Sequence, residues 1–320
     1  MDKVRIETSP PTRPPIMNIL IVGTGALASL FAARLTRAGH TITMLGTWRE
    51  GLDSLNQDGV RLVDADGNES QYPVRATSDP RECAGAKNAI VLVKAWQTER
   101  VATQLRDCLA DDGLALTLQN GLGNRETLIQ SLGSNRAALG STTTGATLLG
   151  PGQVKAGGEG VISLEQNQAL GPLEAALKAA GFNVQSVEDA GALIWGKLVV
   201  NAAINPLTAL LRVKNGELLK RPSARELMKA LALETAEVAQ AEGIQLSFDD
   251  PLKIAEDVAH KTAENTSSML QDVLRGAPTE IDAICGAVVR VGEIHGIETP
   301  VNRVCWQLVK ALLRGHSARG

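Results

Sequence analysis

The sequence predicts an α/β protein, in which an N-terminal domain built on a parallel sheet is followed by an all-α C-terminal domain. Up to about residue 187, short apolar runs of strand length alternate with helical periods, as in parallel-sheet domains. From about Asp189 onward, strand-like runs vanish and long helical periods continue to the C-terminus. Four Trp, three Phe and one Tyr among 320 residues leave a core of Ala, Leu, Val and Ile, which favours helices and parallel strands over an aromatic-rich sandwich.

The first predicted unit is a strand, a glycine turn, a helix and a second strand. The apolar run 18–22 precedes Gly23 and Gly25, and residues 26–38 then show helical spacing of apolar side chains. Gly39 suits the end of that helix, and residues 41–45 read as the second strand. This arrangement predicts a βαβ unit.

The remaining strands of the first domain are expected at 89–93, 114–118, 137–142 and 183–187. The runs 60–63 and 72–74 flank Asp66-Gly67, which predicts a hairpin. We therefore place a dinucleotide-binding domain at residues 17–187 and a helical domain at 188–320. Residues 1–16, with four prolines and no apolar segment of a secretory signal, are expected to form a disordered tail.

Composition excludes several classes of function. The 32 basic and 35 acidic residues give a net charge of −3, so a nucleic-acid partner is not expected. Lys197, Asn201 and Asn205 interrupt the most apolar region, so we expect no membrane span and a soluble, cytoplasmic protein. The four Cys and four His are scattered without ligand spacing, so we expect no metal site and buried cysteines in a reducing compartment.

The glycine turn is the first candidate site. Gly23 and Gly25 allow a tight turn and a close approach of a pyrophosphate, and the following helix offers free N–H groups. Ala28 takes the third position of the fingerprint, where a small side chain packs against the strand. Because the turn lies between a predicted strand and a predicted helix, it indicates a Rossmann-type dinucleotide site. The alternative is a glycine turn without a ligand.

The residues after the second predicted strand bear on the choice of dinucleotide. An acid there would bind the ribose 2′-hydroxyl of NAD, but the chain has no acid until Glu50. The absent carboxylate and the nearby Arg49 favour a 2′-phosphate and hence NADP. Arg49 is equally compatible with a solvated surface charge.

The second candidate site is a polar stripe on an apolar helix. Lys197, Asn201 and Asn205 are spaced i, i+4 and i+8 and so share one helix face. A lysine and two amides are costly to bury unless they are paired or line a cleft. Partial burial would lower the lysine pKa, which suits an acid that protonates a carbonyl oxygen as hydride arrives. The alternative is an exposed stripe on a surface helix.

A second polar cluster lies at 264–272. Asn265 and Ser268 are spaced i, i+3 and could donate to a substrate carboxylate, although a polar helix face or an N-cap would have the same pattern. Glu280 is expected to open a further helix, where a carboxylate is favoured.

Together these segments resemble the ketopantoate reductase (2-dehydropantoate 2-reductase) family. The resemblance runs in order from Met17 to about residue 300, and the C-terminal motifs together are highly specific. The matching segments are Gly23-Thr-Gly-Ala-Leu, Lys94-Ala-Trp-Gln97, Asn120-Gly-Leu-Gly123, residues 197–209, Asn215-Gly-Glu-Leu, residues 264–272 and Thr279-Glu-Ile-Asp282.

The resemblance implies reduction of 2-dehydropantoate to (R)-pantoate with NADPH, in the pathway to pantothenate and coenzyme A. It implies Lys197 as general acid at the keto oxygen. It implies substrate contacts at two ends, with Asn201, Asn205 and Asn215 around the hydroxyl and Asn265 and Ser268 at the carboxylate. Asn120 would lie where nicotinamide meets substrate. The implied cofactor contacts are Gly23, Thr24, Gly25, Ala26, Leu27, Ala28, Lys94, Gln97, Asn120, Ala146 and Glu280.

One position departs from the family pattern. The family often has an arginine at the end of the second strand to hold the 2′-phosphate, and this chain has Thr47 there. Arg49, two residues on, is the expected replacement.

Two other functions remain open at this point. A related 2-oxoacid or opine-type dehydrogenase would keep the lysine and the glycine turn but accept a substrate without the hydroxyl. A non-catalytic protein that senses NADP(H) would need no acid-bearing stripe. The Ala-rich helical domain is compatible with a homodimer.

Overall fold

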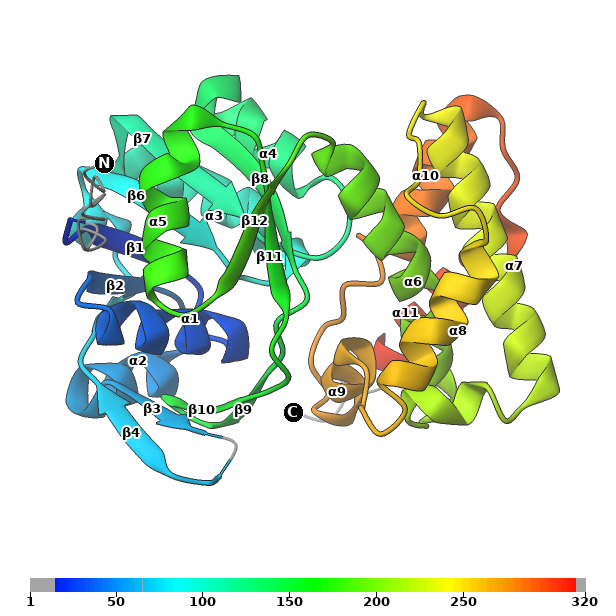
Figure 1. The fold of residues 1–320 in the computed structure, drawn as a ribbon, viewed down its shortest axis with the longest axis horizontal. Helices are drawn as coiled ribbons and strands as arrows, with labels where there is room; N and C mark the ends of the chain where they lie inside the picture. The colour runs from blue at the N-terminus through cyan, green and yellow to red at the C-terminus, as the bar shows by residue number, and fades with distance from the viewer. Residues whose placement is uncertain (1–14, 65, 315–320) are drawn as a thin grey trace, which may run out of the picture.

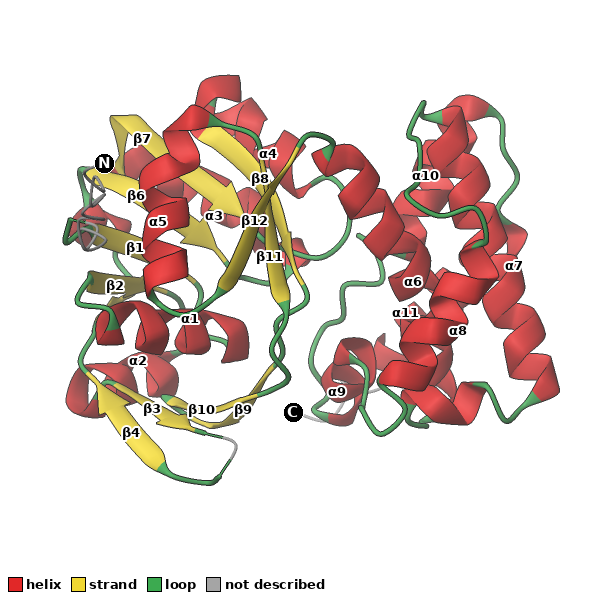
Figure 2. Ribbon diagram, viewed as in Figure 1, coloured by secondary structure: helices red, strands yellow, loops and turns green. Residues whose placement is uncertain are grey.

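The computed structural model describes residues 15–64 and 66–314, so residues 1–14 of the expected tail lie outside it. Figure 1 shows a region of strands and helices beside a region built of helices alone. In the described part of the chain, every strand precedes residue 188, as Figure 2 shows. The predicted fold class, a mainly parallel sheet followed by helices, is confirmed.

The larger sheet has eight strands in the order β12-β11-β8-β7-β6-β1-β2-β5. Neighbouring strands are parallel except β8 and β11. Val22 pairs with Leu45 and with Val91, and Val91 pairs with Thr117, so four strands end in register. The loops after them therefore leave the sheet at one edge. The strands are β1 (Asn18–Val22), β2 (Thr41–Leu45), β5 (Arg75–Thr77), β6 (Ala86–Val91), β7 (Leu109–Thr117), β8 (Ala137–Thr142), β11 (Val161–Glu165) and β12 (Asn183–Val187).

A second sheet has the order β4-β3-β10-β9. Its strands are β3 (Val60–Val63), β4 (Glu69–Tyr72), β9 (Ala146–Gly150) and β10 (Gln153–Ala156). The predicted hairpin is present, since β3 and β4 pair antiparallel with Val60 opposite Tyr72. The second strand expected at 72–74 is wrong: β4 ends at Tyr72, because Pro73 has no N–H with which to continue the ladder.

Helices cover the sheets of the first region. They are α1 (Ala26–Arg37), α2 (Arg49–Asp58), α3 (Thr98–Cys108), α4 (Asn124–Leu132) and α5 (Gly171–Ala179). Leu30, Phe31 and Leu35 of α1 are completely buried in the same apolar cluster as Ile19 and Ile21 of β1. This packing fixes the position of the turn between β1 and α1.

The second region has its own apolar core. Its helices are α6 (Ala190–Leu211), α7 (Pro222–Ala241), α8 (Pro251–Lys261), α9 (Ser268–Leu274), α10 (Cys285–His295) and α11 (Pro300–Arg314). Asp189, directly before α6, caps it by accepting a hydrogen bond from the Ala192 N–H. The core is built around α6, which packs against α7, α8, α9 and α11 and also contacts β8 and β11. All four cysteines are buried and unpaired.

Helix α6 bears on the expectation that the chain has no membrane span. Despite its polar stripe, an 18-residue window of α6 has a mean hydropathy of 1.3, so the helix could cross a membrane by length and composition alone. However, 67% of that window is buried inside the protein. This burial is that of a core helix, because the apolar faces of α6 are covered by neighbouring helices.

Candidate functional site

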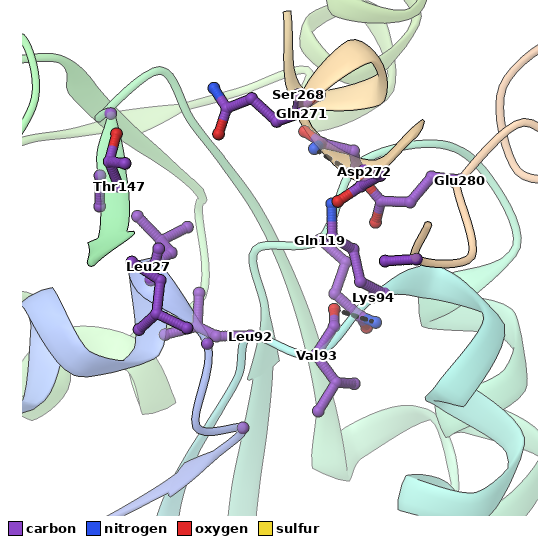
Figure 3. Close-up of a pocket in the computed structure, with 18 of the residues that line it drawn as sticks. Leu27, Leu92, Val93, Lys94, Gln119, Thr147, Ser268, Gln271, Asp272 and Glu280 are labelled. Carbon is purple, nitrogen blue, oxygen red and sulfur yellow. Dashed lines mark hydrogen bonds and ion pairs between the residues drawn. The ribbon is translucent and has the colours of Figure 1, made fainter. Parts of the chain in front are cut away.

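A cavity of about 1230 Å³ opens at the edge where β1, β2, β6 and β7 end. Its opposite wall comes from the helical region, at residues 264–280. Figure 3 shows Leu27, Leu92 and Thr147 on one side of it and Lys94, Asp272 and Glu280 on the other. This volume is large enough for a dinucleotide together with a small acid.

The glycine turn has the space that a dinucleotide needs. Gly23 has φ +130°, and a Cβ there would lie 3.2 Å from the Leu92 backbone, so glycine is required. Gly25 is the N-cap of α1, where no described side chain caps the helix, and a Cβ on Gly25 would meet no described atom within 4 Å. The first N–H groups of α1 are therefore open to a phosphate. The turn fits a pyrophosphate.

Five of the six turn residues predicted to contact the cofactor line the cavity, namely Gly23 to Leu27. Ala28 does not, because its methyl group is completely buried in the core between α1 and the sheet. Its role is the packing that its place in the fingerprint requires, and the contact with the cofactor predicted for it is wrong.

We expect Gly25→Ala to leave the fold intact and to weaken NADPH binding about tenfold or more. The new methyl group has room in the free protein but occupies the space into which the pyrophosphate would come. Titration of intrinsic fluorescence with NADPH measures the dissociation constant, and thermal unfolding checks the fold. The control is Gly171→Ala at the start of α5, where a Cβ would also meet no described atom within 4 Å. Equal affinity of Gly25→Ala and wild type would contradict a phosphate site at this turn.

An ionic cluster joins the two regions at the cavity. The Lys94 Nζ lies 2.7 Å from Asp272 Oδ2 and 3.7 Å from Glu280 Oε2. Burial lowers the pKa of Lys94, but the two carboxylates outweigh it and the net shift is upward. Burial raises the pKa of Asp272 against the opposing effect of Lys94. Lys94 is thus a cation held at the cavity wall.

Glu280 organises the neighbouring loops. Its carboxylate accepts hydrogen bonds from the Ala95 N–H and from Asn120 Nδ2, both at 3.1 Å. The prediction that Glu280 opens a helix is wrong: it lies in a bend, and α10 begins at Cys285. A carboxylate suits this position because its two oxygens are buried beside Lys94 and accept hydrogen bonds. A helix dipole is not the reason.

A buried polar network below the cavity holds the loops after β6 and β7. Gln119 Nε2 donates to the Val93 carbonyl and to Thr98 Oγ1, and its Oε1 accepts from Thr117. Asn124 Nδ2 donates to the Asn120 carbonyl oxygen at 3.0 Å. Sequence reasoning missed this network, because its members are spread from Val93 to Asn124 with no repeated spacing.

Lys197 lies on α6, and its Nζ donates to the Thr142 carbonyl oxygen at 2.7 Å. Burial lowers the pKa of Lys197 from 10.5 to about 8, while the charge of Glu280 opposes the shift. Thr142 lines the cavity, whereas Lys197 does not. The ammonium is therefore hydrogen-bonded to the backbone of a residue that lines the cavity, and its pKa is lowered. That Lys197 acts as the acid remains a prediction.

The other predicted substrate residues divide into two groups. Asn120, Asn265 and Ser268 line the cavity. Asn201 and Asn205 do not; the first is half-buried and the second buried on α6. Asn215 is also buried away from the cavity lining, with Nδ2 donating to Thr262 Oγ1 and with no partner for Oδ1 among the described residues. The structure thus brings the predicted carboxylate-binding residues to the cavity but not those predicted for the hydroxyl.

The cofactor residues predicted outside the turn lie at the cavity with one exception. Lys94, Gln97, Asn120, Ala146 and Glu280 line it. Arg49 does not, because it is an exposed residue at the start of α2. The residue that sequence reasoning missed is Arg100, which lines the cavity and donates to Thr47 Oγ1 at 3.1 Å.

The chain is similar to members of one protein family along most of its length. The family model described as ketopantoate reductase PanE/ApbA matches residues 19–169, and that of its C-terminal part matches residues 189–313. A 2-dehydropantoate 2-reductase of Archaeoglobus fulgidus is 38% identical over 94% of this chain and 99% of its own. One of Halobacterium salinarum is 34% identical over 93% and 99%.

Solved structures have the same fold. A ketopantoate reductase of Ralstonia eutropha JMP134 aligns with a TM-score of 0.88 and 31% identity, covering 94% of this chain and all of that one. D-mandelate dehydrogenase with NADH and anilino(oxo)acetate also gives 0.88, at 28% identity, with 93% and 99% covered. Fold, sequence and site agree: the chain belongs to the ketopantoate reductase family.

Proposed function

We propose that this protein reduces 2-dehydropantoate to (R)-pantoate with NADPH. The observation that carries the proposal is Lys197, a lysine with a pKa of about 8 held against Thr142 at the wall of a cavity that fits a dinucleotide. This reaction belongs to the biosynthesis of pantothenate and coenzyme A, which we place in the cytoplasm. The bound NADPH supplies the hydride.

Lys197 is the proposed proton donor at the keto oxygen of the substrate. Its ammonium already donates to a carbonyl oxygen, that of Thr142, and a substrate carbonyl is an acceptor of the same kind. A pKa near the working pH suits an acid that is protonated before the reaction and able to release its proton during it.

The remaining residues bind and orient. Asn265 and Ser268, beside the N-terminus of α9, offer an amide and a hydroxyl to the substrate carboxylate. Asn120, held by Glu280, is placed to orient the reacting groups. Asn201 and Asn205 share the Lys197 face of α6, and the buried Asn215 Oδ1 has no partner among the described residues, so these amides remain the proposed partners of the substrate hydroxyl.

We also propose that residues 17–187 and 188–320 are separate domains, with the reaction at their junction. Each region has an apolar cluster of its own, and the connection between them is the short segment from Val187 to Ala190. The ionic cluster of Lys94, Asp272 and Glu280 then joins the two domains.

The test compares kcat/KM with NADPH for 2-dehydropantoate and for 2-oxoisovalerate, which lacks the hydroxymethyl group that carries the hydroxyl. We expect a preference for 2-dehydropantoate on the order of 10²-fold or more, because buried amides are left unpaired by the analogue. A preference for 2-oxoisovalerate would contradict the proposed substrate.

The likeness to D-mandelate dehydrogenase favours a second candidate, a dehydrogenase of other 2-oxoacids. Phenylglyoxylate, the oxoacid that corresponds to mandelate, is therefore the third substrate of the same assay. Turnover of phenylglyoxylate above that of 2-dehydropantoate would support this candidate. Tight NADPH binding with no turnover of any of the three acids would instead favour a sensing protein.

A further inference from the structure

The residues after β2 lie beside the glycine turn. The Gly23 N–H donates to the Leu45 carbonyl oxygen at 2.8 Å, and a Cβ on Gly46 would lie 2.6 Å from Thr24 Cγ2. Gly46 and Thr47 line the cavity next to Thr24. In a Rossmann-type domain, the end of this strand faces the adenosine ribose.

This part of the cavity is suited to an anion. Among the described residues that line it, every acidic one (Glu264, Asp272 and Glu280) comes from the helical region, and none comes from the first region. A carboxylate that would bind a ribose 2′-hydroxyl is therefore absent from the described lining near Thr47. The position that selects NAD in other Rossmann-type domains is left open to a phosphate.

Arg100 supplies the positive charge at this position. It lies in the first turn of α3, lines the cavity, and donates from Nη1 to Thr47 Oγ1. Its guanidinium makes no ion pair with a described carboxylate, so most of its five N–H donors remain available. Lys94, by contrast, is already held by Asp272 and Glu280.

We infer that Arg100, together with Thr47, binds the 2′-phosphate of NADPH and sets the preference for NADPH over NADH. This rests on the proposed function. A guanidinium and a hydroxyl at hydrogen-bond distance from each other form a pair of donors for one phosphate, and the partial positive charge at the start of α3 adds to them. Arg100, rather than Arg49, thus supplies the positive charge beside Thr47.

The test measures the dissociation constants of NADPH and NADH by quenching of intrinsic fluorescence. Trp48 and Trp96 line the cavity and report binding without turnover. For Arg100→Gln we expect the dissociation constant of NADPH to rise about 10- to 100-fold, as for loss of a charge-assisted hydrogen bond, and that of NADH to change less than twofold. Arg106→Gln, on the same helix but outside the cavity, is the control and should change neither.

Four outcomes would overturn the inference. The first is an Arg100→Gln protein with unchanged NADPH affinity, and the second is an equal loss for both nucleotides. The third is a larger effect of Arg49→Gln than of Arg100→Gln on NADPH. The fourth is a wild-type protein that binds NADH more tightly than NADPH. That result would overturn the cofactor preference but not the proposed reduction of the substrate. A wild-type protein that binds neither nucleotide would contradict the proposed function itself.

Discussion

Lys197→Met is expected to lower kcat for reduction of 2-dehydropantoate by about 10²- to 10⁴-fold while the protein stays folded, because a general acid contributes that much to a rate. Methionine keeps most of the volume of the lysine stem and removes the ammonium that donates to Thr142. Steady-state NADPH oxidation at saturating substrate measures the loss. Lys229→Met, at an exposed lysine of α7, is the matched control.

The pH dependence follows from the same group. The acid must be protonated, and burial places the pKa of Lys197 at about 8 instead of 10.5. We therefore expect kcat/KM of the wild type to be constant below about pH 8 and to fall about tenfold per pH unit above it. In Lys197→Met the residual activity should lack this step, since the titrating group is gone.

Stability should change in the opposite direction to activity. Because the pKa of Lys197 is lower in the folded protein than in the unfolded chain, the buried ammonium destabilises the fold below about pH 8, and this cost disappears as the pH rises towards 10.5. Because the Lys197 side chain is partly exposed, solvent screens its charge and the cost is on the order of 1–3 kcal/mol. At pH 7, Lys197→Met should thus unfold at a higher temperature than the wild type.

Two results would remove Lys197 from the chemistry. One is an unchanged kcat in the folded variant. The other is a pH profile of Lys197→Met that still falls above pH 8, which would assign the titration to another group. A lower unfolding temperature would show instead that the ammonium is stabilised by its contact with Thr142 more than its burial costs.

The strands that could be predicted from the sequence are those whose own residues carry a recognisable apolar pattern. β1, β2 and β8 have the bounds that their apolar runs indicate, because each is a mostly buried strand of the larger sheet. β9 and β10 could not be predicted in this way. Residues of β9 alternate between half-buried and exposed, and β10 pairs with β3, which lies about 90 residues earlier in the chain.

The candidate site shows the same division. The spacing of Lys197, Asn201 and Asn205 predicts that the three share one face of a helix, because their positions in one short segment are enough to show it. The environment of Glu280 cannot be predicted in this way, because its partners Ala95 and Asn120 lie 185 and 160 residues away in the sequence. Arg100 went unnoticed for a related reason: only the packing of α3 beside the end of β2 brings it to Thr47.

Gly121 is where the loop after β7 meets the helical region. It has φ +83°, and a Cβ there would lie 2.4 Å from the Ala283 carbonyl oxygen. That oxygen also accepts a hydrogen bond from the Leu122 N–H at 3.0 Å, so the two backbones are held together. The contact joins two short segments that carry Asn120 and Glu280, whose side chains are hydrogen-bonded to each other.

Gly121→Ala is therefore expected to lower kcat/KM by about 10²-fold, because the loop must move away from Ala283 and a displacement of about 1 Å at a reacting group costs that much. The control is Gly123→Ala in the same loop: its φ is +89°, but a Cβ there meets nothing within 4 Å. It should show only the strain of a left-handed alanine, about 1–2 kcal/mol in stability, with activity largely kept.

Kinetics and thermal unfolding of both variants separate the two effects. Equal losses of activity would mean that backbone strain alone, and not the contact with Ala283, accounts for the need for glycine. A selective loss in Gly121→Ala would show that the spacing between the two regions at Ala283 sets the geometry of Asn120 and Glu280.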